Sequence, residues 1–225
     1  MSRPLNRKRG ETKSLILSTA AKMFIENGYS KTTMNELAKN AGITYGELFR
    51  VVQDKETLLC NLVGHVLECQ FEKANEVLNS DTDNLIKYYA FETVLQLHIA
   101  ESNENMREMY SVSYSLPHAA EVVYRTITKN LEVIFKDRLP NLETKDFYEL
   151  EIAAAGIMRS YITVPCNIYF TMERKIKRFL ETTFSVYRLS DEEINRIIEF
   201  LSKYDFKKYA LEVQESLFNY LESKI

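Results

Sequence analysis

The sequence has little glycine and proline, six and four residues out of 225, or about 4% where ~12% is typical of globular proteins. Hairpins and tight turns depend on these two residues, so their scarcity excludes a β-sandwich or β-barrel. Apolar residues make up 45% of the chain and charged residues 27%, which is ordinary for a folded domain. We therefore expect an all-α fold with a substantial core.

Long hydrophobic runs are also missing. The longest run, Ile152 to Met158, has seven residues, whereas a membrane-spanning helix needs roughly 20. The basic N-terminus is not followed by the apolar stretch of a secretory signal. We expect a cytoplasmic protein that makes no membrane contact.

Residue patterns that carry catalysis or bind metals are absent. The three cysteines form no CxxC motif, and Cys60 and Cys69 would lie roughly 13 Å apart on one helix, too far for a disulfide. His65, His98 and His118 are scattered and form no HExxH motif. A glycine-rich phosphate loop and a GxSxG motif are missing as well. We predict that the protein is not an enzyme and holds no cofactor or metal.

Charge is unevenly distributed along the chain. Residues 1–60 carry ten Lys/Arg and six Asp/Glu, a net charge of +4, and residues 61–225 carry 19 and 26, a net charge of −7. A basic segment on an acidic body favours contact between that segment and a polyanion such as nucleic acid. A chance asymmetry of surface charge is the alternative at this point.

Short helices are predicted near the N-terminus. Capping boxes at Thr33 to Glu36 and Thr44 to Glu47 open two of them, and Gly42 permits positive φ in the turn between. Helices of about two turns are unstable alone and must be clamped by neighbours. This arrangement is typical of a helix-turn-helix motif. The predicted helices cover about 11–27, 34–39 and 45–51, and the motif covers about 32–51.

The rest of the chain is predicted to form longer helices. The alternation of Tyr110 to Ser115 is typical of a strand, but no second strand is available to pair with it. Periodicity and caps predict helices over 55–78, 83–101, a short one around 110–114, 117–138, 146–164 (with Thr144 as cap), 167–188, 191–204 and 206–223. We divide the chain into a basic arm (1–10), a helix-turn-helix DNA-binding domain (11–57) and a helical body (58–225).

The predicted helix-turn-helix domain, residues 11–57, is called the head below. About 45 residues in and just after it carry a recognisable pattern without gaps. It consists of Ala20, Ala21, Phe24, Asn27, Gly28, Tyr29, Thr32, Thr33, Glu36, Leu37, Ala38, Ala41, Gly42, Ile43, Thr44, Gly46, Leu48, Phe49, Asp54, Lys55, Glu56, Thr57 and Leu58. The pattern resembles the DNA-binding domain of the tetracycline-repressor (TetR) family of bacterial transcription regulators. The resemblance implies an N-terminal three-helix DNA-binding domain and a C-terminal helical domain for ligand binding and dimerisation.

The helix over 45–51 would read DNA. Tyr45 can contact a thymine methyl or a phosphate, and Arg50 can read guanine or grip a phosphate. Gly46 either lets the helix lie close to the groove floor or fits tight packing on the preceding helix. The family usually has Tyr at the position of Phe49. The candidate DNA-binding residues are Arg7, Lys8, Arg9, Thr32, Thr33, Thr44, Tyr45, Gly46, Phe49, Arg50 and Lys55.

Other head residues are assigned to the DNA backbone. Lys55 lies in the first turn of a helix, where we expect it to clamp a phosphate. Thr32 and Thr33 would offer a hydroxyl and backbone N–H groups at a helix start. The basic arm either tracks the adjacent backbone or minor groove, or only solubilises the chain.

One head buries too little surface for tight specific binding, so we expect a homodimer on a palindromic duplex, with heads ~34 Å apart. The family resemblance implies a four-helix interface made by two late helices of each subunit. The helices over 146–164 and 167–188 are the candidates. Small residues from Ala153 to Gly156 would permit close approach between subunits, or else pack inside their own subunit.

Aromatic residues in the body indicate a possible small-molecule effector site. Residues 61–225 hold 22 Phe and Tyr, 12 of them Tyr, whose hydroxyls need partners when buried. Converging aromatic and polar side chains would line an apolar pocket, although a filled core is the alternative. The candidate ligand-binding residues are Phe91, Leu95, His98, Tyr110, Tyr114 and Tyr161.

Two hypotheses follow. The first is a dimeric repressor that an unknown small molecule releases from a palindromic operator. The second is a DNA-associated regulator whose body binds a protein partner. An unfilled pocket favours the first, and a filled core with an exposed apolar patch favours the second.

Overall fold

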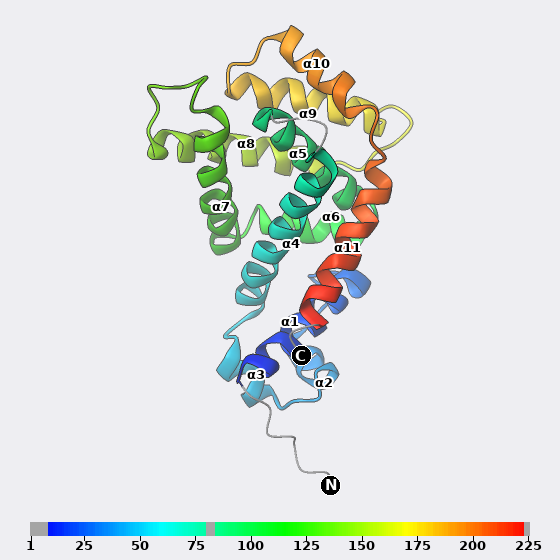
Figure 1. Ribbon diagram of the computed structural model, residues 1–225. Helices are drawn as coiled ribbons and strands as arrows, with labels where there is room; N and C mark the ends of the chain where they lie inside the picture. Colours follow the sequence, from blue (N-terminus) through cyan, green and yellow to red (C-terminus); the bar gives the residue numbers. More distant parts are fainter. Residues whose placement is uncertain (1–8, 80–83, 223–225) are drawn as a thin grey trace.

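The computed structural model describes residues 9–79 and 84–222, and in these ranges the chain forms helices and no strand (Figure 1). None of the helices described is both long and apolar enough to cross a membrane. The all-α prediction is confirmed. The helices are α1 (Arg9–Asn27), α2 (Met34–Asn40), α3 (Tyr45–Val51), α4 (Lys55–Leu78), α5 (Leu85–Glu101), α6 (Glu104–Ser113), α7 (Pro117–Phe135), α8 (Thr144–Thr163), α9 (Met172–Val186), α10 (Asp191–Leu201) and α11 (Phe206–Glu222).

A small head of three helices lies at one end of the molecule (Figure 1). The apolar stripe of α1, formed by Ile16, Ala20 and Phe24, is buried. It packs with Leu37 of α2 and Leu48 of α3, neither of which has any exposed surface. The two short helices are thus held by α1 and by the start of α4, as their marginal intrinsic stability requires.

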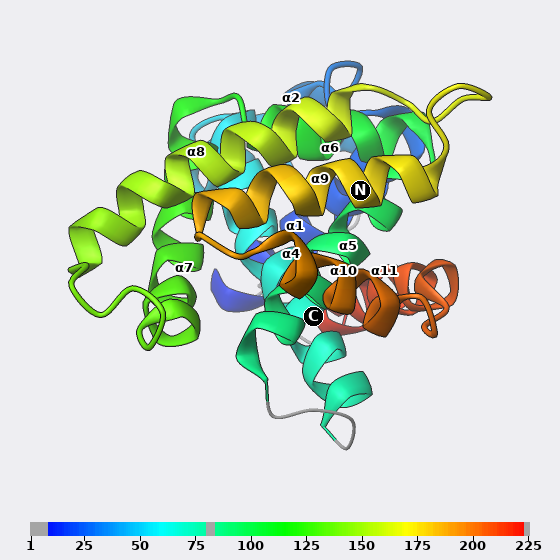
Figure 2. The ribbon, with the colours of Figure 1, turned by 90° about the horizontal axis from the view of Figure 1, so that it is seen from above.

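The body surrounds α5. Every residue from Tyr89 to Leu97 is buried, because α4, α6, α7, α8, α9, α10 and α11 all contact this helix. α8 and α9 lie side by side on the outer surface (Figure 2). α11 returns beside α4 and reaches α1, so the end of the described chain lies next to the head (Figure 1).

Both predicted capping boxes of the head are present and begin α2 and α3 at the expected residues. The fourth helix, Lys55–Leu78, also begins and ends as predicted, with Asp54 as N-cap. α4 therefore begins inside the predicted head and continues into the body.

Several other predicted boundaries were wrong. Arg9 and Gly10, expected in the basic arm, belong to α1. α5 begins at Leu85 because the side chain of Asn84 caps it, and the predicted start at residue 83 lies outside the described residues. The short sixth helix begins at Glu104, because Asn103 caps it, and it ends at Ser113, so Tyr114 is its C-cap and not a residue within it.

The late helices also differ from prediction. α7 ends at Phe135 instead of 138, and α10 ends at Leu201 instead of 204. α8 begins at Thr144 because Glu143 and Asp146 form a capping box. α9 begins five residues later than predicted, since Asn167 and Phe170 exchange two main-chain hydrogen bonds in a turn.

Candidate nucleic-acid interface and body cavity

α3 presents one face to solvent and packs the other against the head. Tyr45 is 49% exposed and Phe49 is 52% exposed, whereas Leu48 between them is completely buried. The rings of Tyr45 and Phe49 stack at a centroid distance of 6.3 Å, as neighbours four residues apart on a helix can. Arg50 is exposed, and its Nε donates to the carbonyl of Gly46 at 3.2 Å. The structure therefore brings the predicted recognition residues onto one accessible face.

Gly46 has no packing role in this fold. A Cβ placed on this residue would meet no atom within 4 Å other than its own helix and its chain neighbours. Glycine inside a helix costs about 1 kcal/mol relative to alanine, so a local reason for glycine is missing. The interpretation that Gly46 fits tight packing on α2 is wrong.

Thr33 and Thr44 hold the starts of α2 and α3. The hydroxyl of Thr44 accepts from the main-chain N of Glu47 at 3.2 Å and donates to the Glu47 carboxylate at 2.8 Å. Thr33 and Glu36 make the matching pair of contacts. These hydrogen bonds lower the pKa values of Glu36 and Glu47. Both threonines are exposed, yet their hydroxyls already bind carboxylates of the chain.

The predicted phosphate contact of the Thr32 side chain is wrong. Thr32 is 1% exposed, and its hydroxyl donates to the carbonyls of Gly28 at 2.9 Å and Met23 at 3.3 Å. The hydroxyl therefore closes the end of α1 inside the head and does not face solvent.

Lys55 also has a different role from the one predicted. Its Nζ donates to the carbonyls of Tyr29 at 2.7 Å and Thr32 at 3.0 Å, and it lies 4.2 Å from the centroid of the Tyr29 ring. Desolvation lowers the pKa of this ammonium group. Its position in the first turn of α4 indicated a phosphate, but the nearby turn between α1 and α2 supplies the oxygen atoms instead.

The remaining basic candidates are only partly placed. Arg7 and Lys8 lie outside the described residues, and Arg9 begins α1. Lys31 precedes α2 and Lys39 lies in its last turn, and both are exposed basic side chains that the sequence motif did not include. Their charge was visible in the sequence, but only the folded head shows that both side chains are exposed.

α6 of the body holds the end of α1. Asn105 donates from Nδ2 to the carbonyls of Ile25 at 3.0 Å and Glu26 at 2.8 Å. Glu108 accepts from the main-chain N of Ser30 at 3.1 Å. Gly28 adopts φ +90° beneath them, and a Cβ there would lie 2.6 Å from Oε2 of Glu108. Sequence analysis missed this junction, because its partners are about 80 positions apart.

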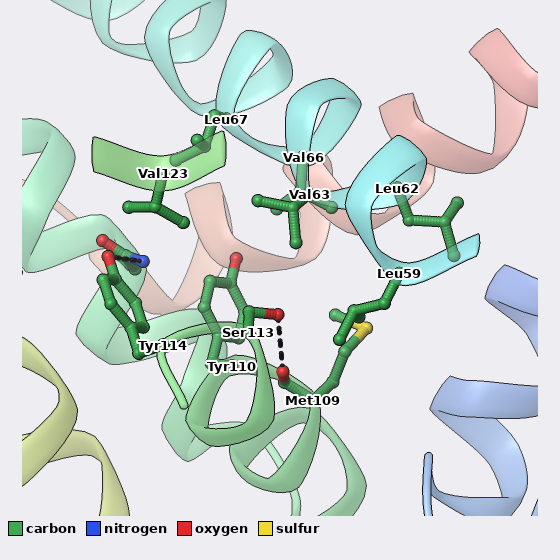
Figure 3. A pocket seen from close by; sticks show the side chains of 11 residues that line it. Leu59, Leu62, Val63, Val66, Leu67, Met109, Tyr110, Ser113, Tyr114 and Val123 are labelled. Atoms are coloured by element: carbon green, nitrogen blue, oxygen red, sulfur yellow. Dashed lines mark hydrogen bonds between the residues drawn. The ribbon is translucent and has the colours of Figure 1, made fainter. Parts of the chain in front are cut away.

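An apolar cavity of about 20 Å³ lies between α4, α6 and α7 (Figure 3). α4 lines one side with Leu59, Leu62, Val63, Val66 and Leu67. Met109, Tyr110, Ser113, Tyr114, Gln96 and Val123 complete the lining. A volume of this size holds about one water molecule, so the core is nearly filled.

The predicted ligand-binding set does not converge on this cavity. Tyr110 and Tyr114 line it, but Phe91 and His98 pack against Phe206 of α11 with centroids 4.7 and 5.4 Å away. The prediction that all six residues form one pocket is wrong, because α5 is buried on all sides and its residues face different neighbours. Tyr161 lies near Phe170 and Phe179, and Leu95 is fully buried but does not line the cavity.

Two glutamines hold the tyrosine hydroxyls at the cavity. Nε2 of Gln96 donates to the hydroxyl of Tyr114 at 2.7 Å, and Nε2 of Gln70 donates to the hydroxyl of Tyr110. Both glutamines are buried, and Oε1 of Gln70 has no hydrogen-bond partner in the part of the chain that the structure describes. Polar side chains are present at the apolar cavity, as expected, but two of them are glutamines that the sequence analysis did not single out.

A second cavity of about 20 Å³ lies between α5 and α8. It shares Gln96 and Tyr114 with the first cavity. Glu92 of α5 and Glu151 of α8 also line it, and they are 1% and 3% exposed. Burial raises the pKa of Glu92 to about 8, and burial followed by the charge of Glu92 raises the pKa of Glu151.

The small residues of α8 divide between two faces. Ala154 and Ala155 are buried and line the second cavity, whereas Ala153 and Gly156 are exposed. A Cβ on Gly156 would meet no other atom within 4 Å. Of the two alternatives for these residues, packing inside the subunit holds for Ala154 and Ala155, while Ala153 and Gly156 remain on the outer surface.

Comparison with known sequences identifies the head. The sequence profile described as "Bacterial regulatory proteins, tetR family" matches residues 16–60. The regulator YuxN of Bacillus subtilis is 29% identical over 112 residues, which are 50% of this chain and 38% of YuxN. The repressor BepR of Brucella suis is 24% identical over 102 residues, 45% of this chain and 49% of BepR. The chain thus spans less than half the length of these relatives.

Comparison with solved structures extends the similarity to the body. The crystal structure of RolR in complex with resorcinol superposes with a TM-score of 0.65 at 16% sequence identity. The superposition covers 87% of this chain and 95% of RolR. At this identity the likeness concerns the fold, and it includes both the head and most of the helical body.

Proposed function

The chain belongs to the tetR family of bacterial regulatory proteins, a family of regulators rather than enzymes, and on this premise we propose that it is a dimeric repressor released from palindromic DNA by a small molecule. The head binds the major groove through α3, as the second helix of a helix-turn-helix does. The body dimerises and receives the effector.

The exposed face of α3 carries this proposal. Tyr45, Phe49 and Arg50 are solvent-exposed on a helix that its own capping box and the buried Leu48 hold in place. Exposed aromatic side chains are costly to hydrate, and a cluster of them on a surface indicates an interaction site. Base edges and thymine methyl groups are suitable partners for this site, and Gly46 leaves room for the groove floor.

Selection of bound sequences from a pool of random DNA duplexes tests the DNA-binding part. We expect enrichment of an inverted repeat with half-site centres one helical turn, ~34 Å, apart or a multiple of this. Tyr45→Ala should change the preferred bases. Failure of the intact protein to enrich any sequence would contradict the proposal.

The outer surface of α8 and α9 is the proposed dimer interface. The two helices lie side by side and open to solvent (Figure 2). Ala153 and Gly156 leave room on this face for a partner helix, since small residues allow close approach of backbones. Two heads on one twofold axis would then contact two half-sites.

The first cavity is the proposed effector site, and two of the helices that line it also contact the head. Its wall on α4 begins at Leu59, one turn after Lys55, which holds the carbonyls of Tyr29 and Thr32. α6 lines another side of the cavity, and the same helix carries Asn105 and Glu108, which bind the end of α1 and the turn after it. Because the cavity holds about one water, a larger ligand must displace lining helices, and displacement of α4 or α6 would move the head with them. Such a ligand shifts DNA affinity only if it prefers one head position.

Binding of a protein partner by the body remains the second candidate function. Ile168 and Tyr169, in the turn before α9, are 83% and 82% exposed. An open groove between α4, α5 and α7 also exposes Leu85 and Val133. These apolar surfaces favour a macromolecular contact. A partner that alters DNA affinity in a protein whose cavities bind no ligand would support this candidate.

A further inference from the structure

The second cavity is lined by two buried acids, each with one carboxyl oxygen that no group in the described part of the chain pairs. Oε1 of Glu92 and Oε2 of Glu151 have no hydrogen-bond partner among residues 9–79 and 84–222, although both atoms are fully buried. Buried polar atoms in native proteins are nearly always paired, and an unpaired one costs stability. Two unpaired carboxyl oxygens at one cavity therefore point to a partner that is not part of this chain.

The cavity lining supplies no cation of its own. The titratable groups around Glu92 and Glu151 are the phenols of Tyr89 on α5 and Tyr114 after α6. Tyr110 on α6 also interacts electrostatically with Glu92, and Tyr187 after α9 does so with Glu151. Among the described lining residues, α7 and α9 contribute only Ile127 and Phe179. Lys175 of α9 is bound elsewhere, to Glu101 and the carbonyl of Val164.

The partner that fits this lining is a protonated amine. Its N–H groups donate to carboxylate oxygens, and its positive charge allows a buried acid to ionise. Aromatic rings are also favourable neighbours for an ammonium group. A neutral ligand would satisfy the hydrogen bonds but would leave the acids protonated.

We propose that Glu92 and Glu151 form the binding site for the ammonium group of an organic amine, whose apolar body extends past Tyr114 and Gln96 into the first cavity. This inference names the effector class of the proposed regulator and rests on that function. The two cavities share Tyr114 and Gln96, so a ligand that separates this hydrogen-bonded pair connects them. The apolar walls of the first cavity then receive the body of the ligand next to α4 (Figure 3).

Proton release follows from this arrangement. In the free protein Glu92 binds a proton below its pKa of about 8. An ammonium group that binds the ionised form must displace that proton, so its affinity rises as the pH increases toward 8. For one proton released, the increase is about tenfold per pH unit.

Calorimetric titration of the intact protein with 2-phenylethylamine and with the neutral analogue 2-phenylethanol tests the inference. The amine stays protonated from about pH 6 to about pH 8, as a lysine side chain does. We expect the amine to bind at least tenfold more tightly than the alcohol at about pH 7.5. Its affinity should rise with pH, and buffers of different ionisation enthalpy should reveal a released proton. Equal affinity for both probes, no binding of the amine, or no proton release would overturn the inference.

Matched variants locate the site. Glu92→Gln and Glu151→Gln replace a protonated acid by a group of the same shape, and each should weaken amine binding at least tenfold. Glu149→Gln, on the exposed surface of α8, should leave it unchanged. Wild-type proton release needs no variant, so the test survives even if a variant misfolds. Equal losses in all three variants would overturn the assignment.

DNA binding separates this inference from the proposed function. If the protein binds a selected duplex but not the amine, the amine site is wrong and the DNA-binding function stands. If the amine binds with proton release but leaves the affinity for duplex unchanged, the site stands and release by an effector is wrong.

Discussion

Oε1 of Glu108 accepts a hydrogen bond from the main-chain N of Ser30 at 3.1 Å, although the two residues are 78 positions apart in the chain. Glu108 lies on the helix that also carries Tyr110, so one helix touches both the cavity and the turn after α1. A change in the position of α6 must therefore reach the head directly, in addition to any movement of α4.

Loss of Asn105 should loosen this junction. Asn105→Ala removes two hydrogen bonds to the last carbonyls of α1, and each is worth about 0.5–1.5 kcal/mol. We expect amide hydrogen exchange in residues 28–32 to become about tenfold faster, since ~1.4 kcal/mol corresponds to a factor of ten. Glu104→Ala, exposed on the same helix, is the control and should leave this exchange unchanged. Unchanged exchange in Asn105→Ala would show that the contact does not restrain the head.

Gly46→Ala should raise the stability of the protein and lower its affinity for DNA. Alanine gains up to about 1 kcal/mol of helix propensity, and its Cβ meets no atom of the protein. We therefore expect a more stable protein that binds its selected duplex more weakly, as measured by urea denaturation and fluorescence anisotropy. Gly42→Ala provides a contrast, because φ +65° at this turn makes alanine unfavourable by about 1–2 kcal/mol. Unchanged duplex affinity in Gly46→Ala would contradict close approach of α3 to the groove.

Substitution of Lys55 should lower the stability of the protein, whereas substitution of Arg50 should change its DNA binding. Lys55→Met removes the ammonium donor from the carbonyls of Tyr29 and Thr32, which should cost about 1–3 kcal/mol of stability. Arg50→Met should change stability by less than about 0.5 kcal/mol. If Arg50 contacts a phosphate, its loss should reduce the salt dependence of DNA binding by about one unit per head. A reduced salt dependence in Lys55→Met would instead restore a phosphate contact to that residue.

The buried acid Glu92 should make the protein less stable as the pH rises. Its pKa is about 8 in the folded chain, above the ~4.3 of an unfolded glutamate. Its favourable contribution is complete below the unfolded value and is lost as the pH rises through 8, by at most about 1.4 kcal/mol per pH unit. His98, whose pKa burial lowers to about 4, acts in the opposite direction mainly below pH 6.5.

Urea denaturation between about pH 6.5 and about pH 8 measures this effect. The free energy of unfolding should fall with pH in the wild-type protein, and Glu92→Gln should reduce the slope. Glu149→Gln is the exposed control on α8. A wild-type slope that Glu92→Gln does not alter would assign the pH dependence to other groups.

Gly156→Arg should prevent dimerisation without unfolding the chain. The site is open within one subunit, so the arginine side chain meets solvent there. Between two subunits it would separate the helices and bring two like charges together. Sedimentation should show a monomer with an unchanged circular dichroism spectrum, while Glu215→Arg on the exposed side of α11 should remain dimeric. A dimeric Gly156→Arg protein would place the interface elsewhere.

Local chemistry made much of the head predictable. The capping boxes at Thr33 and Thr44 each involve residues three positions apart, so the sequence places α2 and α3 without knowledge of the rest of the fold. The start of α9 was less predictable, since the turn at Asn167 to Phe170 is even richer in apolar residues than the helix that follows. Boundaries that depend on a hydrogen bond in a particular turn are poorly encoded by periodicity.

The roles of side chains depend on distant neighbours. Lys55 has the composition and position of a phosphate ligand, yet carbonyls 26 and 23 residues away occupy its Nζ. Neighbouring residues of α5 meet different helices. Phe91 packs on α11, whereas Glu92, the next residue, faces α8. A helix buried on all sides has no preferred apolar face, so its pattern does not tell which neighbour each residue meets.

Residue patterns alone predicted a helical chain, a capped helix-turn-helix near its N-terminus and α3 as the candidate recognition helix, because caps, turns and periodicity act within a few residues. Long-range packing, in contrast, was needed to show that Lys55 and Thr32 bind carbonyls in the head, that α6 holds α1, and that Glu92 and Glu151 line one cavity. These contacts join residues far apart in the chain, and burial then changes the hydrogen bonding and pKa of groups whose chemistry in water is ordinary.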